Sequence, residues 1–110
     1  MSKPVTRSYT SMDSGAQAPV PLDWLSLAQM TVGVYIVDGT ADYSVEFTLD
    51  DVNDPDITPR WFTSQEFPVN TMATKYAGIA NPWTFLRINF ASIAGNVELK
   101  VQQVFMNGSR

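Results

Sequence analysis

The chain contains neither cysteine nor histidine. The lack of cysteine excludes disulfides, thiolate nucleophiles and sulfur ligands for a metal ion. The lack of histidine removes the one side chain whose unperturbed pKa lies close to neutral pH. Nucleophilic and general acid–base catalysis depend most often on these two residue types. We therefore expect a protein that is not an enzyme and that uses no cofactor.

Long apolar runs are also missing. No apolar segment approaches the ~20 residues that a membrane-spanning helix needs. Residues 1–5 lack the apolar stretch of a secretory signal. Apolar residues nevertheless make up 45% of the 110-residue chain, which is enough for the core of one domain. We expect a single globular domain that is synthesised in a cytoplasm and has no membrane partner.

Negative charge is concentrated in the middle of the chain. The net charge is −4, but residues 38–66 contain eight acidic residues against Arg60 alone, a local charge of −7. This distribution favours docking of an acidic surface onto a basic partner, and it disfavours a broad phosphate-binding surface. Nucleic acid is therefore not an expected partner. The alternative is that the acidic segment only keeps an all-β protein soluble.

Residues 42–49 alternate strictly between apolar and polar side chains. Tyr43, Val45, Phe47 and Leu49 fall on one side of the segment, and polar residues fall on the other. This alternation predicts a strand with one buried face.

Three further segments alternate in the same way, and glycine-containing tripeptides join them and residues 42–49 into two pairs. Residues 29–37 precede Asp-Gly-Thr at 38–40, which predicts a tight turn into the next strand. Residues 83–90 and 97–102 flank Ala-Gly-Asn at 94–96, which predicts a hairpin. With shorter segments between them, we expect six to eight strands and no helix. The predicted fold is an antiparallel β-sandwich or a jelly-roll-like small barrel.

The N-terminal region has a different composition. Residues 1–18 are rich in Ser, Thr, Gly, Ala and Gln and show no sustained period. Pro19 and Pro21 then stiffen the entry to residues 22–27, which have apolar side chains on both faces. We predict an extended arm over residues 1–18 and a single β-sandwich domain over residues 19–110. The alternative is an ordinary first strand with a frayed tail.

Two groups of side chains suggest binding sites, and each has a simpler interpretation. The acidic loop from Asp50 to Asp56 could supply oxygen ligands to calcium, but its spacing is not that of an EF-hand, so a solvated loop is favoured. The aromatic residues Trp24, Trp61 and Trp83, with Tyr35, Tyr43 and Tyr76, could form a platform for stacking against sugars. In a domain this small, packing in the core or in an interface is the favoured role for these rings.

Two segments resemble those of a known class of viral proteins. The first is YSVEFTLDD at 43–51, followed by RWF at 60–62, and the second is FLRIN at 85–89 with GNVELKVQ at 95–102. They are similar to the small all-β proteins that accompany the major capsid protein of tailed bacteriophages, including the decoration (cement or staple) proteins of short-tailed phages. The resemblance covers about the last two-thirds of the chain.

This resemblance implies a structural virion protein on the outer capsid surface. Such a protein would clamp neighbouring subunits of the major capsid protein, as a homo-oligomer, a dimer or trimer at a symmetry axis. Many modest contacts repeated over a lattice suffice for this role, and an extended arm could pair with an exposed strand edge. The residues that we expect to contact the partner are Lys3, Val5, Arg7, Tyr9, Trp24, Leu25, Trp61, Phe62 and Arg87.

An alternative function is a carbohydrate- or receptor-binding module of a phage tail or fibre. It would present Trp61 or Trp83 on one exposed face, where a sugar ring could stack. Loss of glycan binding on Trp61→Ala without loss of the fold would favour this alternative.

Overall fold

Every regular element among the described residues is a β-strand. The structure is a computed structural model that describes residues 5–22, 27–79 and 83–105. The strands are β1 Val5–Thr10, β2 Gly15–Ala16, β3 Val20–Pro21, β4 Leu27–Thr48, β5 Trp61–Thr63, β6 Lys75–Ile79 and β7 Phe85–Phe105. They form one antiparallel sheet, so the predicted all-β class and the predicted number of strands are confirmed. None of the described residues belongs to a helix that could cross a membrane.

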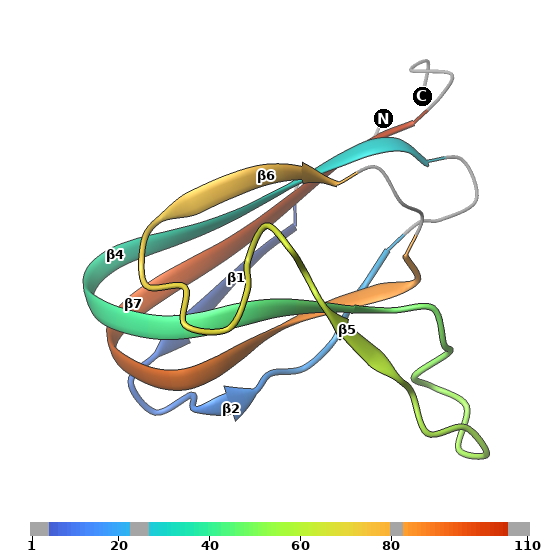
Figure 1. Cartoon of the computed structure of the whole chain (residues 1–110), viewed down its shortest axis with the longest axis horizontal. Helices are drawn as coiled ribbons and strands as arrows, with labels where there is room; N and C mark the ends of the chain where they lie inside the picture. The colour runs from blue at the N-terminus through green and yellow to red at the C-terminus, as the bar shows by residue number, and fades with distance from the viewer. Residues whose placement is uncertain (1–4, 23–26, 80–82, 106–110) are drawn as a thin grey trace.

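Two long strands form the centre of the sheet. β4 and β7 run antiparallel and pair along their whole length, from Leu27 opposite Phe105 to Thr48 opposite Phe85. β1, β2 and β3 pair with the other side of β7, whereas β5 and β6 pair with the other side of β4. The short strands are therefore all held by one long antiparallel pair (Figure 1).

The turns predicted at residues 38–40 and 94–96 are wrong, because β4 continues through the first position and β7 through the second. Gly39 and Gly95 lie directly opposite each other and both have positive φ, 76° and 133°. A Cβ atom on Gly39 would collide with the carbonyl of Ala94, and one on Gly95 would collide with the carbonyl of Asp38. The glycines therefore permit two backbones to approach closely at a bend, rather than reversing the chain.

A β-bulge in each long strand accompanies the bend. One extra residue, Val37, lies between paired positions of β4, and another, Ala91, lies between paired positions of β7. Each extra residue shifts the alternation of the strand by one position. Accordingly, the buried apolar residues of β4 are even-numbered up to Val34 and odd-numbered from Ala41. Both halves of the strand thus keep their apolar side chains on the inner face of the sheet.

The bent sheet encloses one hydrophobic core. Both long ribbons turn back strongly at the left of Figure 1, so that the two halves of each strand lie one above the other. Buried side chains from both halves form a single cluster. The inward orientation predicted for Tyr43, Val45 and Phe47 is confirmed. Leu49 is exposed, because β4 ends one residue before it.

The extended N-terminal arm is not confirmed. Val5–Thr10 forms an edge strand of the sheet, paired with residues 96–101 of β7. Further along, Val20 pairs with β7 and is buried, as is Leu22. Because these apolar side chains complete the core, residues 5–22 are part of the folded unit. Residues 1–4 of the predicted arm lie outside the described residues.

Candidate functional site

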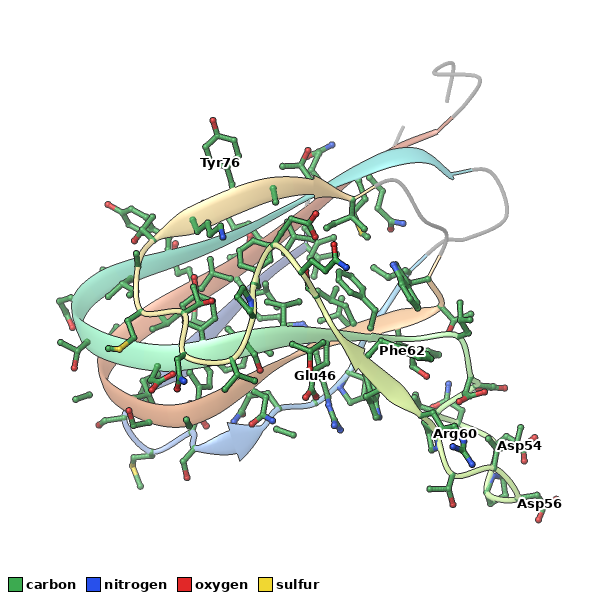
Figure 2. The ribbon with its side chains drawn as sticks, viewed as in Figure 1. Glu46, Asp54, Asp56, Arg60, Phe62 and Tyr76 are labelled. Carbon is green, nitrogen blue, oxygen red and sulfur yellow. The ribbon has the colours of Figure 1, made fainter. Side chains whose placement is uncertain are left out.

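The short strand β5 directs two aromatic side chains to opposite faces of the sheet. Trp61 lies opposite Thr48, and Phe62 lies opposite the buried Phe47. Successive side chains of a strand point to opposite faces, so Phe62 lies on the inner face and Trp61 on the outer face. Figure 2 shows β5 at the edge of the molecule, between the core and the acidic loop.

On the outer face, Trp61 belongs to a contact with two charged residues. The guanidinium of Arg87 lies 4.1 Å from the centroid of the Trp61 ring. The Nε atom of Arg87 donates a hydrogen bond of 2.6 Å to Oε1 of Glu46, and both side chains are largely shielded from water. Arg87 and Trp61, two of the predicted partner contacts, thus contact each other and tie β5 to β7 across β4.

On the inner face, Phe62 joins two other aromatic rings. Trp83 stacks on Phe47 with ring centroids 5.3 Å apart and 21° between the ring planes. Phe62 lies on Trp83 at 5.7 Å and 40°. Phe47 is buried and Trp83 is half-buried, but Phe62 is 51% exposed. Phe62 is therefore the ring of this cluster that an external molecule can most readily contact.

These rings form one wall of a hollow of about 510 Å³, which we call the aromatic hollow. Its described lining residues are Phe47, Phe62, Thr63, Ser64, Gln65, Glu66, Gly78, Ile79 and Trp83. Glu66 is the only charged residue among them. Its Oε1 atom accepts a hydrogen bond of 3.2 Å from Oγ of Ser64, whose own backbone N–H is bound to the carbonyl of Val45. The hollow therefore combines apolar ring surface with one positioned carboxylate.

A second exposed surface is the outer face of the other half of the sheet. The register of β1, β4, β6 and β7 aligns eight side chains there, which we call the tyrosine face. Its members are Thr6, Ser8, Thr31, Tyr35, Tyr76, Glu98, Lys100 and Gln102. Tyr35 is 54% exposed and Tyr76 is 79% exposed. The only two charges of the set, on Glu98 and Lys100, lie 4.0 Å apart, so these eight side chains have no net charge. The exposed Asp38, opposite Asn96, follows next to them on the same face.

The tyrosines flank a glycine, which leaves room beside their rings. Tyr76 of β6 pairs with Gly33 of β4, and a Cβ atom at Gly33 would lie 3.8 Å from the Cβ atom of Tyr76. Figure 2 shows the Tyr76 side chain pointing away from the sheet. The ring is accordingly open to contact from solvent or from a partner.

The acidic loop after β4 uses carboxylates to hold its own backbone. Asp50 accepts a hydrogen bond of 2.7 Å from the backbone N–H of Arg60. Asp51 and Asp54 each accept one of 2.9 Å from the backbone N–H two residues later. These are the local side-chain contacts typical of turns. Within the described ranges, no three acidic side chains come together to hold a metal ion.

The remaining predicted contact residues lie in or near β1. Tyr9 is buried and packs edge-on against Phe90, with ring centroids 5.3 Å apart. Val5 packs against the core, and Arg7 is half-buried on the same inner side of β1. Lys3, Trp24 and Leu25 lie outside the described residues. Of the predicted set, the structure therefore brings together Trp61, Phe62 and Arg87 around β5.

Three notable residues, Tyr35, Tyr76 and Glu66, do not belong to the predicted set of partner contacts. Tyr35 alternates with Val34 and Ile36, so its outward orientation follows from the pattern that predicted the strand. Tyr76 lies in a segment with no clear alternation. Glu66 and Trp83 line the same hollow only because their segments lie on either side of β4 in the folded sheet. No local sequence signal indicates that Glu66 lies there.

Comparison with known proteins identified no relationship for this chain. No protein-family model, no curated protein and no solved structure matches it.

Proposed function

We propose that this protein is a structural component of a bacteriophage particle, which binds the outer capsid surface and stabilises neighbouring subunits of the major capsid protein. The tyrosine face carries this proposal. Two highly exposed tyrosine rings lie there beside a glycine and small hydroxyl side chains, on strands that are paired on both sides or fixed to the core. The resemblance of two segments to capsid decoration proteins supplies the identity of the partner.

The composition of the tyrosine face suits protein binding. Tyrosine gives a large contact area at a small cost in side-chain entropy, and its hydroxyl can form a hydrogen bond at the edge of an interface. Glu98 and Lys100 offset each other's charge, so these side chains do not repel a partner surface of either sign. Because the side chains project from one sheet, few backbone degrees of freedom are lost on docking. The face therefore suits a contact that is repeated many times on a shell.

The distribution of charge suggests an orientation on the capsid. Figure 2 shows Tyr76 at one side of the molecule and Asp54 and Asp56 at the far tip of the acidic loop. In our proposal the tyrosine face contacts the capsid and the acidic loop points to solvent, where its charge opposes non-specific association. Self-association as a dimer or trimer at a symmetry axis is part of the proposal.

The test is co-sedimentation of the purified protein with capsids that lack it. The double variant Tyr35→Ser, Tyr76→Ser is expected to bind at least about tenfold more weakly, because two interface rings are removed. Both side chains are outside the core, so unfolding by denaturant should change little. The matched control is Asp54→Asn with Asp56→Asn, which alters one half-buried and one exposed side chain at the far tip. Equal binding by the double tyrosine variant and the wild type would refute the assigned face.

The alternative function is a carbohydrate- or receptor-binding module of a phage tail or fibre. The aromatic hollow favours it, since Phe62 and Trp83 lie beside the polar Gln65 and Glu66. Trp61 is a less suitable platform, because Arg87 covers its ring. Glycan binding that is lost on Phe62→Ala but kept on Trp61→Ala would support this function.

A further inference from the structure

One guanidinium site is already complete on the outer face of β5. Arg87 lies 4.1 Å from the centroid of the Trp61 ring and 2.6 Å from a carboxylate oxygen of Glu46. The ring attracts the cation through its negative face, and the carboxylate pairs with it through a charge-assisted hydrogen bond. This arrangement shows which groups hold a guanidinium at this end of the sheet.

The inner face of β5 has the same two kinds of group without the cation. The aromatic hollow places the Phe62 and Trp83 rings on its wall, with Glu66 on the same lining. Among the described residues, the ion pairs are Arg87 with Glu46 and Lys100 with Glu98, and neither involves Glu66. The Glu66 carboxylate accepts a hydrogen bond from Ser64 and remains exposed.

We propose that the aromatic hollow binds an arginine side chain of a partner protein, with its guanidinium between the exposed Phe62 ring and the Glu66 carboxylate. The inference goes beyond the proposed capsid contact, because none of the described residues that line the hollow belongs to the tyrosine face. Arginine fits better than lysine, because its planar guanidinium stacks on rings and is weakly hydrated. The local excess of negative charge in residues 38–66 favours the approach of a basic side chain.

Other ligand classes fit the hollow less well. An anion would meet the Glu66 carboxylate with no basic residue among the described lining to offset the repulsion. A neutral sugar could stack on Phe62 and donate a hydroxyl hydrogen bond to Glu66, but that hydrogen bond is weaker than one from a cationic donor. The guanidinium satisfies the ring and the carboxylate together.

The test is a titration of the purified protein with N-acetylarginine methylamide, followed through the indole N–H and amide signals in an NMR spectrum. We expect saturable shifts at Trp83 and at residues 62–66. The isosteric neutral probe N-acetylcitrulline methylamide should cause no comparable shift. Glu66→Gln and Phe62→Ala should each weaken binding about fivefold or more, because each removes one of the two contacts. Asp56→Asn, which removes an exposed acid at the tip of the acidic loop, is the matched control.

The outcomes separate this inference from the proposed function, because no capsid is present in the titration. Equal shifts with the arginine and citrulline probes, or no saturable shift with either, would overturn the arginine site. Shifts caused by N-acetylglucosamine in its place would overturn it in favour of a glycan site. The capsid co-sedimentation described above would remain valid in each of these cases.

Discussion

Tyr43 combines a fully buried ring with a polar end that is bound inside the protein. Its hydroxyl donates a hydrogen bond of 2.6 Å to the backbone carbonyl of Ala73, and its ring lies in the core next to Phe67. Burial raises the pKa of Tyr43 from 10.0 to about 12. Burial also raises the pKa of Tyr9, although the positive charge of Arg7 opposes this effect. Both tyrosines therefore resist ionisation in the folded protein.

The raised pKa of Tyr43 predicts a loss of stability in alkali. The unfolded chain releases the tyrosine proton near pH 10, whereas the folded chain retains it up to about pH 12. The unfolded state therefore binds fewer protons in this window, and the free energy of unfolding falls as the pH rises from about 10 to about 12. Denaturant unfolding at a series of pH values measures this slope.

The variant Tyr43→Phe should show a shallower slope above pH 10, with only Tyr9 still contributing. At neutral pH it should lose about 1 kcal/mol of stability, because the hydrogen bond to Ala73 is removed. An unchanged slope in Tyr43→Phe would show that the Tyr43 hydroxyl ionises as freely in the folded protein as in the unfolded chain.

At the scale of elements, the bend in the β4–β7 pair determines the shape of the sheet. Gly39 and Gly95 face each other at the bend, and the bulged residues Val37 and Ala91 lie on either side of it. Together they let two strands of more than twenty residues fold over one core, where unbent strands would leave one end without a packing partner.

Replacement of Gly39 by alanine should therefore destabilise the protein strongly. The new Cβ would meet the Ala94 carbonyl, and φ at this position is positive, so we expect a loss of about 3 kcal/mol or more. Gly15→Ala is the matched control. Gly15 also has positive φ, at 82°, but nothing lies within 4 Å of its Cβ position, so only about 1 kcal/mol should be lost. Equal losses in denaturant unfolding would contradict the close approach at Gly39.

The central strands were predictable from the sequence, but β1 and the connections were not. Alternation over residues 42–48 and 85–90 identified the buried apolar side chains, since the period is local, but it did not predict that Ser44 and Thr48 are buried as well. Asp-Gly at 38–39 is a strong turn signal, yet the structure uses it for a bulged bend. The two glycines differ from turn glycines only in being opposite each other, and that pairing joins residues 56 positions apart. A local pattern does not contain this information.

At the scale of the whole molecule, the candidate surfaces arise from pairing between distant segments. The tyrosine face needs β6 beside β4, and the aromatic hollow needs β5, Glu66 and Trp83 around the end of the sheet. The sequence predicted Trp61, Phe62 and Arg87 as contact residues, because aromatic and basic side chains near a strand are common in binding sites. It did not place Tyr76 or Glu66 among the partner contacts, because their importance depends on which residues become their neighbours.

The whole molecule has different surfaces at its two ends. The acidic loop lies at one end (Figure 2), and the neutral tyrosine face lies on the other half of the sheet. An asymmetric arrangement of this kind suits a protein that binds a large surface in one orientation. In our account, one side contacts the shell while the charged loop keeps bound copies from aggregating with other particles.

The central claim is tested most directly by the temperature at which capsids rupture with and without the bound protein. Capsids that lack the protein would be saturated with it, separated from the excess and heated while release of their contents is followed. The account predicts binding at a fixed ratio to the major capsid protein and rupture at a higher temperature, because binding to the intact shell stabilises that state. Failure to saturate, or an unchanged rupture temperature at full occupancy, would contradict it.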